Sequence, residues 1–160
     1  MNILTDEQAA ERRLALPSGG LLTGLSQDFV DDLQLAGAFV EYNQQIIVAA
    51  GAPIEYVSCI IAGQVKISRM DSNYAKAQVG TLSKGEWFGA TSLFVRNPTV
   101  EEIFAEGEVV VWTMPPDTLR RMLFEERGAV QLLYNIGALL AQKLTSPSQA
   151  PVAAAAQAPR

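Results

Sequence analysis

The sequence KGEWFGATSLFVRNPTVEEIFA, Lys84–Ala105, decides the fold of this chain. A glycine turn leads into the aromatic pair Trp87-Phe88, and Gly89 then opens a single helical turn over Ala90–Phe94. Asn97-Pro98 reverses the chain into an extended run. A strand, a short helix, a turn and a second strand form an anion cradle, because a glycine before a helix start lets backbone N–H groups point at one spot.

The side chains of this cradle do not suit an anion. A phosphate site also needs a cation, and none stands where the cradle predicts one. Glu101 and Glu102 occupy the following strand, and alternation along the strand turns one of them toward the cradle, where it repels an anion. The alternative is that the two acids keep an edge strand soluble.

Length and composition predict one globular domain. The chain has 160 residues, of which 49% are hydrophobic and 18% charged, so it can bury a substantial core. Its 12 basic and 17 acidic residues give a formal net charge of -5. We therefore expect no nucleic-acid partner. No segment has the pattern of a secretory signal or the length of a membrane span, so the sequence predicts a cytoplasmic protein.

The absence of histidine argues against most classes of enzyme. Without histidine the chain has no Ser-His or Cys-His nucleophile pair and none of the usual zinc sites. Cys59, the single cysteine, lies in an apolar run and is expected to be buried and inert, with redox activity as the alternative. We expect no catalytic residue, no metal and no cofactor.

The first part of the chain contains an arm and a helix. Residues 1–20 mix charges with short apolar runs and end in a Gly-rich turn, which predicts a loose or weakly helical N-terminal arm or a docking segment. Ser26 is a good N-cap, and apolar residues then recur at helical spacing to about Gly37. These residues predict the first helix.

The period then changes to that of β-structure. Seven short β-branched or aromatic runs alternate with turn residues between Phe39 and Trp112, which indicates a β-sandwich or barrel. The runs lie at 39–42, 46–48, 57–61, 65–67, 77–82, 100–104 and 109–112.

Two helices are expected to close the fold. The first begins at Pro116 or Asp117 and ends before Gly128. The second spans Ala129–Leu144 and carries a stripe of apolar residues at steps of three and four. This stripe either packs on the barrel or pairs with a copy of itself, and we assign the partner surface to Val130, Leu133, Ile136 and Leu140. Residues 145–160 are predicted to form a disordered Ala/Pro-rich tail.

With these elements in place, the sequence resembles the cyclic nucleotide-binding domain family of bacterial catabolite-activator-type regulators, kinase regulatory subunits and gated channels. The resemblance covers 21–144 and rests on GLSQDFVDDL, the Gly51-Ala52-Pro53 turn, IIAGQV, VGTLSKGEWFG, NPT and VVVWTMPPDTLRRML. It implies a mainly β fold with flanking helices, namely the jelly-roll β-barrel of that family.

The resemblance also implies which residues form the ligand cradle. In the family a glutamate binds the ribose and an arginine binds the cyclic phosphate, followed by small residues. Here Ala90 stands for the glutamate, Thr99 for the arginine, and Val100 with two acids for the small residues. Arg96 either swings in to replace the arginine or is an ordinary loop residue. The cradle positions are Phe88, Gly89, Ala90, Thr91, Ser92, Pro98, Thr99 and Val100.

These features predict a non-catalytic, degenerate cyclic-nucleotide-binding-like domain. We expect it to have lost cAMP and cGMP binding and to regulate by contacting another protein or itself. The alternative is a ligand-sensing domain whose reshaped cradle takes a cyclic nucleotide or another small molecule in a different way. A small molecule that raises the melting temperature would favour the alternative.

Overall fold

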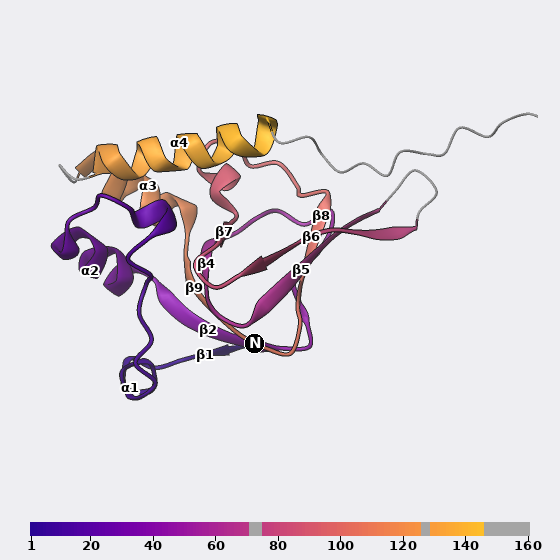
Figure 1. The fold of residues 1–160 in the computed structure, drawn as a ribbon, viewed down its shortest axis with the longest axis horizontal. Helices are drawn as coiled ribbons and strands as arrows, with labels where there is room; N and C mark the ends of the chain where they lie inside the picture. Colours follow the sequence, from indigo (N-terminus) through magenta and orange to yellow (C-terminus); the bar gives the residue numbers. More distant parts are fainter. Residues whose placement is uncertain (71–74, 126–128, 146–160) are drawn as a thin grey trace, which may run out of the picture.

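The structure is a computed structural model that describes residues 1–70, 75–125 and 129–145. Two antiparallel sheets face each other, with strand orders β1-β2-β9-β4-β7 and β3-β8-β5-β6 (Figure 1). The strands are β1 (Asn2–Ile3), β2 (Ala38–Asn43), β3 (Ile46–Val48), β4 (Val57–Ala62), β5 (Gln64–Met70), β6 (Lys76–Ser83), β7 (Trp87–Phe88), β8 (Glu101–Ala105) and β9 (Glu108–Met114).

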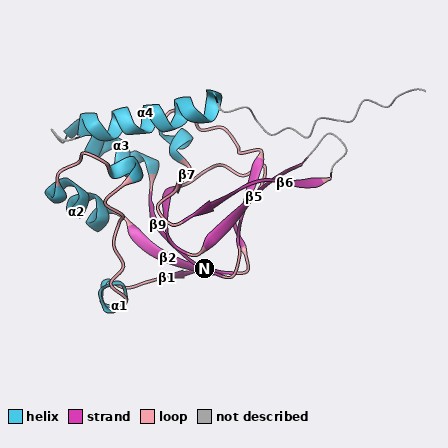
Figure 2. Cartoon of the chain, viewed as in Figure 1, coloured by secondary structure: helices cyan, strands magenta, loops and turns pink. Residues whose placement is uncertain are grey.

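The longer helices gather on one side of the strands (Figure 2). The Ser26 hydroxyl accepts a hydrogen bond from the Phe29 N–H and caps the helix Gln27–Ala36, as the sequence predicts. The helices are α1 (Asp6–Glu11), η1 (Gly20–Leu22), α2 (Gln27–Ala36), η2 (Ala90–Leu93), α3 (Pro116–Glu125) and α4 (Ala129–Thr145).

The core consists of two layers that share the larger sheet. One layer fills the space between the two sheets and contains Val40, Ile60, Val65 and Ile103. The other lies between the larger sheet and the helices. Trp87 and Trp112 meet there edge to face, with ring centroids 5.7 Å apart. Both rings are buried in this layer.

The strand pattern and the fold class are confirmed, with one refinement. Each predicted run lies in or within one residue of a strand, and the three longer helices form where the sequence places them. Among the described residues, however, no strand pairing joins the two sheets into a closed barrel. The jelly roll therefore consists of two facing antiparallel sheets.

The N-terminal twenty residues pack against the domain. Asn2 and Ile3 pair with β2 in antiparallel register, and the Thr5 side chain caps α1. Leu4, Ala9 and Leu16 join the core layer under the helices. The boundary expected at residue 20 stays a prediction. The predicted tail falls on residues 145–160, of which only Thr145 lies within the described residues. No helix of the described residues combines the length and hydrophobicity that a membrane span requires.

Candidate functional site: the cradle between β7 and β8

Gly89 is the position that shapes the cradle. Its φ of +80° lies in the left-handed region, and it stands as the N-cap of the short helix η2. A Cβ at this position would lie 2.2 Å from the carbonyl oxygen of Tyr56. Two independent constraints, backbone conformation and space, therefore require glycine here. The expected helical turn forms as a 3₁₀ turn that ends one residue before Phe94.

The cradle side chains divide into buried and exposed groups. Phe88 packs in the layer between the sheets, while Ala90 packs in the layer under the helices. The Ser92 hydroxyl is also buried and donates a 2.6 Å hydrogen bond to the Gly89 carbonyl. Thr91, Pro98 and Val100 are exposed. The predicted residues thus lie along one continuous segment, but several of them support the fold and do not face solvent.

Thr99 is the residue that the sequence resemblance aligned with an arginine. Its hydroxyl accepts a 3.0 Å hydrogen bond from the Glu101 N–H, and its backbone bonds to the segment before β4. The Thr99 N–H donates to the Ala52 carbonyl at 2.9 Å, and the Thr99 carbonyl accepts from the Gly51 N–H at 2.7 Å. The polar groups around Thr99 are therefore engaged within the chain.

The two acids that follow are paired with cations on the neighbouring strands. Glu101 accepts a 2.6 Å hydrogen bond from the Arg69 guanidinium, and Glu102 pairs with the Lys76 ammonium. Glu101 lies on the same strand face as Ile103, which is buried between the sheets, so Glu101 is the acid on the inner face. The ion pairs reduce the repulsion predicted from the acids, but they also occupy Arg69 and Lys76.

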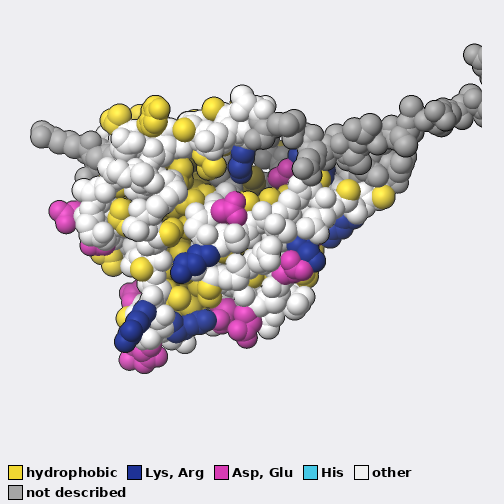
Figure 3. All heavy atoms as spheres, viewed as in Figure 1, with side chains coloured by type: hydrophobic (Ala, Val, Ile, Leu, Met, Phe, Trp, Pro, Cys, Tyr) yellow, Lys and Arg dark blue, Asp and Glu magenta, His cyan; other side chains and the backbone are white. Residues whose placement is uncertain are grey.

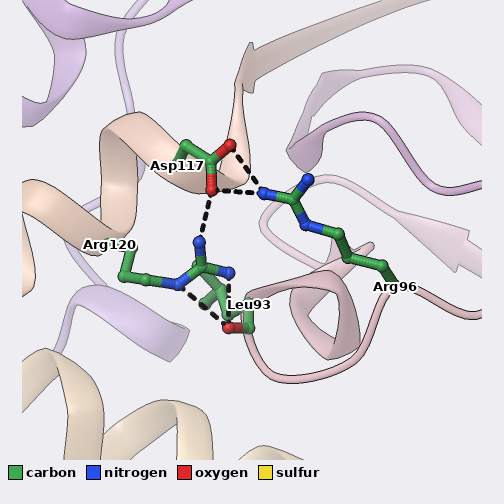
Figure 4. A network of polar contacts seen from close by, with 4 residues as sticks. All are labelled: Leu93, Arg96, Asp117 and Arg120. Carbon is green, nitrogen blue, oxygen red and sulfur yellow. Dashed lines mark hydrogen bonds and ion pairs between the residues drawn. The ribbon is translucent and has the colours of Figure 1, made fainter.

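Arg96 points away from the cradle toward α3 (Figure 4). Its guanidinium donates two 2.8 Å hydrogen bonds to the Asp117 carboxylate, which also pairs with Arg120. Arg120 in turn donates to the Leu93 carbonyl at 2.8 Å, at the end of η2. The hydrogen bond from Arg96 is the main reason that the pKa of Asp117 lies below its ordinary value. Arg96 therefore ties the loop to α3 in this structure.

The described residues contain no cluster of the kind that binds a metal ion. No group of three or more histidine, cysteine or acidic side chains could hold a metal ion within residues 1–70, 75–125 and 129–145. Cys59 is completely buried, and this burial raises the pKa of its thiol to about 12. The expectation that Cys59 is buried is confirmed, and a thiol that stays protonated is a poor nucleophile.

The apolar stripe of α4 divides between the core and the surface. Ile136 is fully buried and Leu140 is half-buried against the core, whereas Val130 is 75% and Leu133 45% exposed. Figure 3 shows hydrophobic side chains gathered along the outer side of α4, at the top of the view. The outward-facing stripe consists of Val130, Leu133, Tyr134, Gly137, Ala141 and Leu144, and we call it the outer stripe.

Comparison with known proteins identifies the family. The family model described as "Cyclic nucleotide-binding domain" matches residues 42–126, more than half of the chain, and this chain belongs to that family. A search of curated proteins found no match. The resemblance inferred from the sequence is therefore confirmed.

Solved structures agree on the fold. The catabolite activator protein of Thermus thermophilus has a TM-score of 0.72 at 21% identity, with 79% of this chain and 58% of that chain covered. The N-terminal domain of a transcriptional regulator from Streptomyces coelicolor has a TM-score of 0.70 at 19% identity, with coverages of 80% and 93%. This chain thus spans little more than half the length of the Thermus protein.

A third similar structure is a mutant regulatory subunit of a cAMP-independent protein kinase A from Trypanosoma brucei, bound to cAMP in the A site. Its TM-score is 0.68 at 19% identity, and the match covers 89% of this chain and 48% of that chain. At such identities the similarity establishes the fold alone.

Proposed function

We propose that this chain is a non-catalytic regulatory module that does not hold cAMP or cGMP in the way usual for its family and that acts through protein contacts. The observation that carries the proposal is the state of the cradle. A threonine replaces the phosphate-binding arginine, and its hydroxyl is already bonded to the Glu101 N–H. The flanking cations Arg69, Lys76 and Arg96 are each paired with a carboxylate.

The lost contacts are large enough to abolish tight binding of a cyclic nucleotide. A charge-assisted hydrogen bond contributes about 1.5–3 kcal/mol, so losing a bidentate arginine contact weakens binding roughly 100-fold or more. Loss of the ribose contact at Ala90 adds about 1 kcal/mol. The partial charge at the start of a short helical turn supplies at most about 1 kcal/mol, which does not offset these losses.

The similar Trypanosoma brucei protein motivates a reversal experiment. It is a regulatory subunit of a cAMP-independent kinase, and a mutant of it is bound to cAMP. In the present chain, Thr99→Arg would restore the cation, and Glu101→Ala would remove the carboxylate that would otherwise pair with it. The double variant leaves Ala90 unchanged, because a glutamate there would place a carboxylate in the core layer under the helices.

Isothermal titration with cAMP, cGMP and a cyclic dinucleotide tests this part of the proposal. We expect no binding at micromolar concentrations by the wild type, and binding at least 10-fold tighter by Thr99→Arg/Glu101→Ala. Glu101→Ala alone is the matched control, since it frees Arg69 without adding a cation at position 99. Submicromolar binding of any of these nucleotides by the wild type would overturn the proposal.

For the protein contact we propose a second copy of the chain, seated on the outer stripe of α4. The six stripe residues carry no charge, so two copies of this acidic protein can approach there without direct charge repulsion. Gly137 and Ala141 lie in the middle of the stripe between larger residues, which allows two helices to approach closely. The 17-residue helix holds roughly two heptads, so we expect a weak dimer.

Size-exclusion chromatography with light scattering tests the self-association. Val130→Asp/Leu133→Asp should shift the protein toward the monomer mass of 17.3 kDa, with an unchanged circular dichroism spectrum. Gln142→Glu adds a charge to the same helix outside the stripe and should have no effect. A wild type that is monomeric at all concentrations would exclude the second copy and leave a different protein as the partner. The predicted cytoplasmic location stays a prediction from the sequence.

A further inference from the structure

A cavity of about 640 Å³ lies beside the larger sheet, bounded on its other side by β3 and by the segment that joins β3 to β4. This volume falls within the range of small-molecule sites. Four strands of the larger sheet supply its floor, and residues 47–56 supply the opposite wall. The floor residues are Val40, Ser58, Phe88 and Thr113, and the wall includes Ile47, Val48, Ala52 and Pro53.

The floor of the cavity contains a hydrogen-bond donor with no acceptor. The hydroxyls of Ser58 and Thr113 lie 2.9 Å apart, and their residues are only 3% and 9% exposed. One hydrogen bond between them uses one of the two hydroxyl hydrogens. Within the described part of the chain, no further acceptor bonds to either hydroxyl. A buried donor of this kind favours an oxygen acceptor supplied from the cavity.

The remaining lining selects against anions. Among the described residues of the lining there is no lysine or arginine, and the exposed Glu55 is one of the lining residues. Tyr42 and Tyr56 also line the cavity. Burial, followed by the neighbouring Tyr56, raises the pKa of the Tyr42 phenol, so this group is neutral at physiological pH. A carboxylate or phosphate would meet Glu55 and a chain of net charge -5.

We propose that this cavity binds a neutral, mainly apolar small molecule with a carbonyl or ether oxygen that accepts a hydrogen bond from the Ser58–Thr113 hydroxyl pair. The apolar body would pack against Val40, Phe88 and Val48. The cavity shares Phe88 with the cradle, but its hydroxyl pair and the wall residues Ala52 and Pro53 lie outside the cradle positions. It adds ligand sensing to the regulatory role proposed above.

Two neutral fluorescent dyes test the site directly. Nile red carries a carbonyl oxygen, whereas N-phenyl-1-naphthylamine has an apolar body without one. We expect both dyes to bind the wild type saturably at one site per chain. The variant Ser58→Ala/Thr113→Val keeps the shape of the floor but removes both hydroxyls. It should weaken Nile red binding about 5- to 10-fold and leave the second dye nearly unchanged.

A second pair of variants fills the cavity from opposite sides. Ala38 pairs with Thr113 across two strands and shares its face, so Ala38→Leu extends over the floor. Ala52→Leu enters from the opposite wall. Each should weaken binding of both dyes at least 10-fold, and Ala10→Leu on the exposed surface of α1 serves as the matched control.

The results that would overturn the proposal are equally specific. Saturable binding that survives both filling variants would place the dyes elsewhere, and binding that disappears in Val130→Asp/Leu133→Asp would place them on the outer stripe. Absence of saturable binding to the wild type would also overturn it. Equal losses of both dyes in the hydroxyl variant would exclude the hydrogen bond. Thermal unfolding of each variant confirms that it is folded before the dye binding is measured.

Discussion

The cradle and the cavity lie on two sides of residues 51–53, and they differ in which polar groups are available to a ligand. The cradle is joined to this segment by two backbone hydrogen bonds. The Gly51 N–H donates to the Thr99 carbonyl, and the Thr99 N–H donates to the Ala52 carbonyl. On the other side of the segment, Ala52 and Pro53 form part of the cavity wall. The cradle has a left-handed glycine before a short helical turn, but the polar groups around Thr99 are bonded within the chain. The cavity has free volume and an unused hydroxyl donor.

This difference shows that backbone shape and ligand chemistry are set by different residues. Gly89 is required by the fold itself, because the Tyr56 carbonyl leaves no room for a side chain. Thr99 and Glu101 lie outside the left-handed region, so their backbone conformation does not restrict their side chains in this way.

The largest effect is expected at the cradle backbone. Gly89→Ala forces a side chain into the left-handed region and against the Tyr56 carbonyl, so it should lower the free energy of unfolding by about 3 kcal/mol. Gly85→Ala is the matched control, since Gly85 has a φ of +87° but open space around it. It should cost about 1 kcal/mol. Urea unfolding measures both, and equal losses would show that the close approach to Tyr56 is unimportant.

The next effect concerns the hydroxyl pair of the cavity. Ser58→Ala and Thr113→Val each leave one buried hydroxyl without its partner and should cost about 1–2 kcal/mol, whereas the double variant should be close to neutral. A double-mutant cycle in urea gives the coupling energy. If the two losses simply add, the hydroxyls are independent, and the cavity floor has no shared donor to offer a ligand.

A smaller effect is expected at the ion pair beside the cradle. The Arg69 and Glu101 side chains are 46% and 35% exposed, so their interaction is screened and Glu101→Gln should cost about 0.5 kcal/mol. High salt should reduce the difference between wild type and variant. A cost that is large and independent of salt would show that the pair holds the start of β8 in place.

Much of the fold could be predicted from the sequence, because it depends on local and periodic signals. Ser26 marks a helix start, alternating apolar residues mark the strands, and Gly89 marks the turn into η2. Cys59 was placed in the core for the same reason, since it lies in an apolar run. Each of these signals is contained in a few consecutive residues.

The site was predictable only in outline, because its side chains are paired across long sequence separations. The cradle segment could be located, but the partners of Arg96 and Glu101 lie 21 and 32 residues away. Ser58 and Thr113 are 55 residues apart, and nothing in either neighbourhood marks them as a pair. The one local signal that was missed is Thr99-Val100-Glu101, in which a threonine two residues before a backbone N–H can form a side-chain turn.

The smallest effect is expected at the Arg96–Asp117 contact, which holds the cradle loop against α3. Asp117 is exposed, and its pKa in the folded protein lies below its ordinary value of 3.8, chiefly because of the hydrogen bond from Arg96. A lowered pKa stabilises the folded state when the pH lies above the pKa of the unfolded state, and this contribution disappears as the pH falls through the pKa of the folded state.

Asp117→Asn should therefore lower the melting temperature slightly at pH 7 and remove part of the acid sensitivity below pH 4. Arg96→Ala should retain some of that sensitivity, because Arg120 still pairs with Asp117. If Asp117→Asn and wild type lose stability in parallel as the pH falls, the ionised Asp117 carboxylate does not stabilise the fold, and the Arg96–Asp117 contact does not hold the loop.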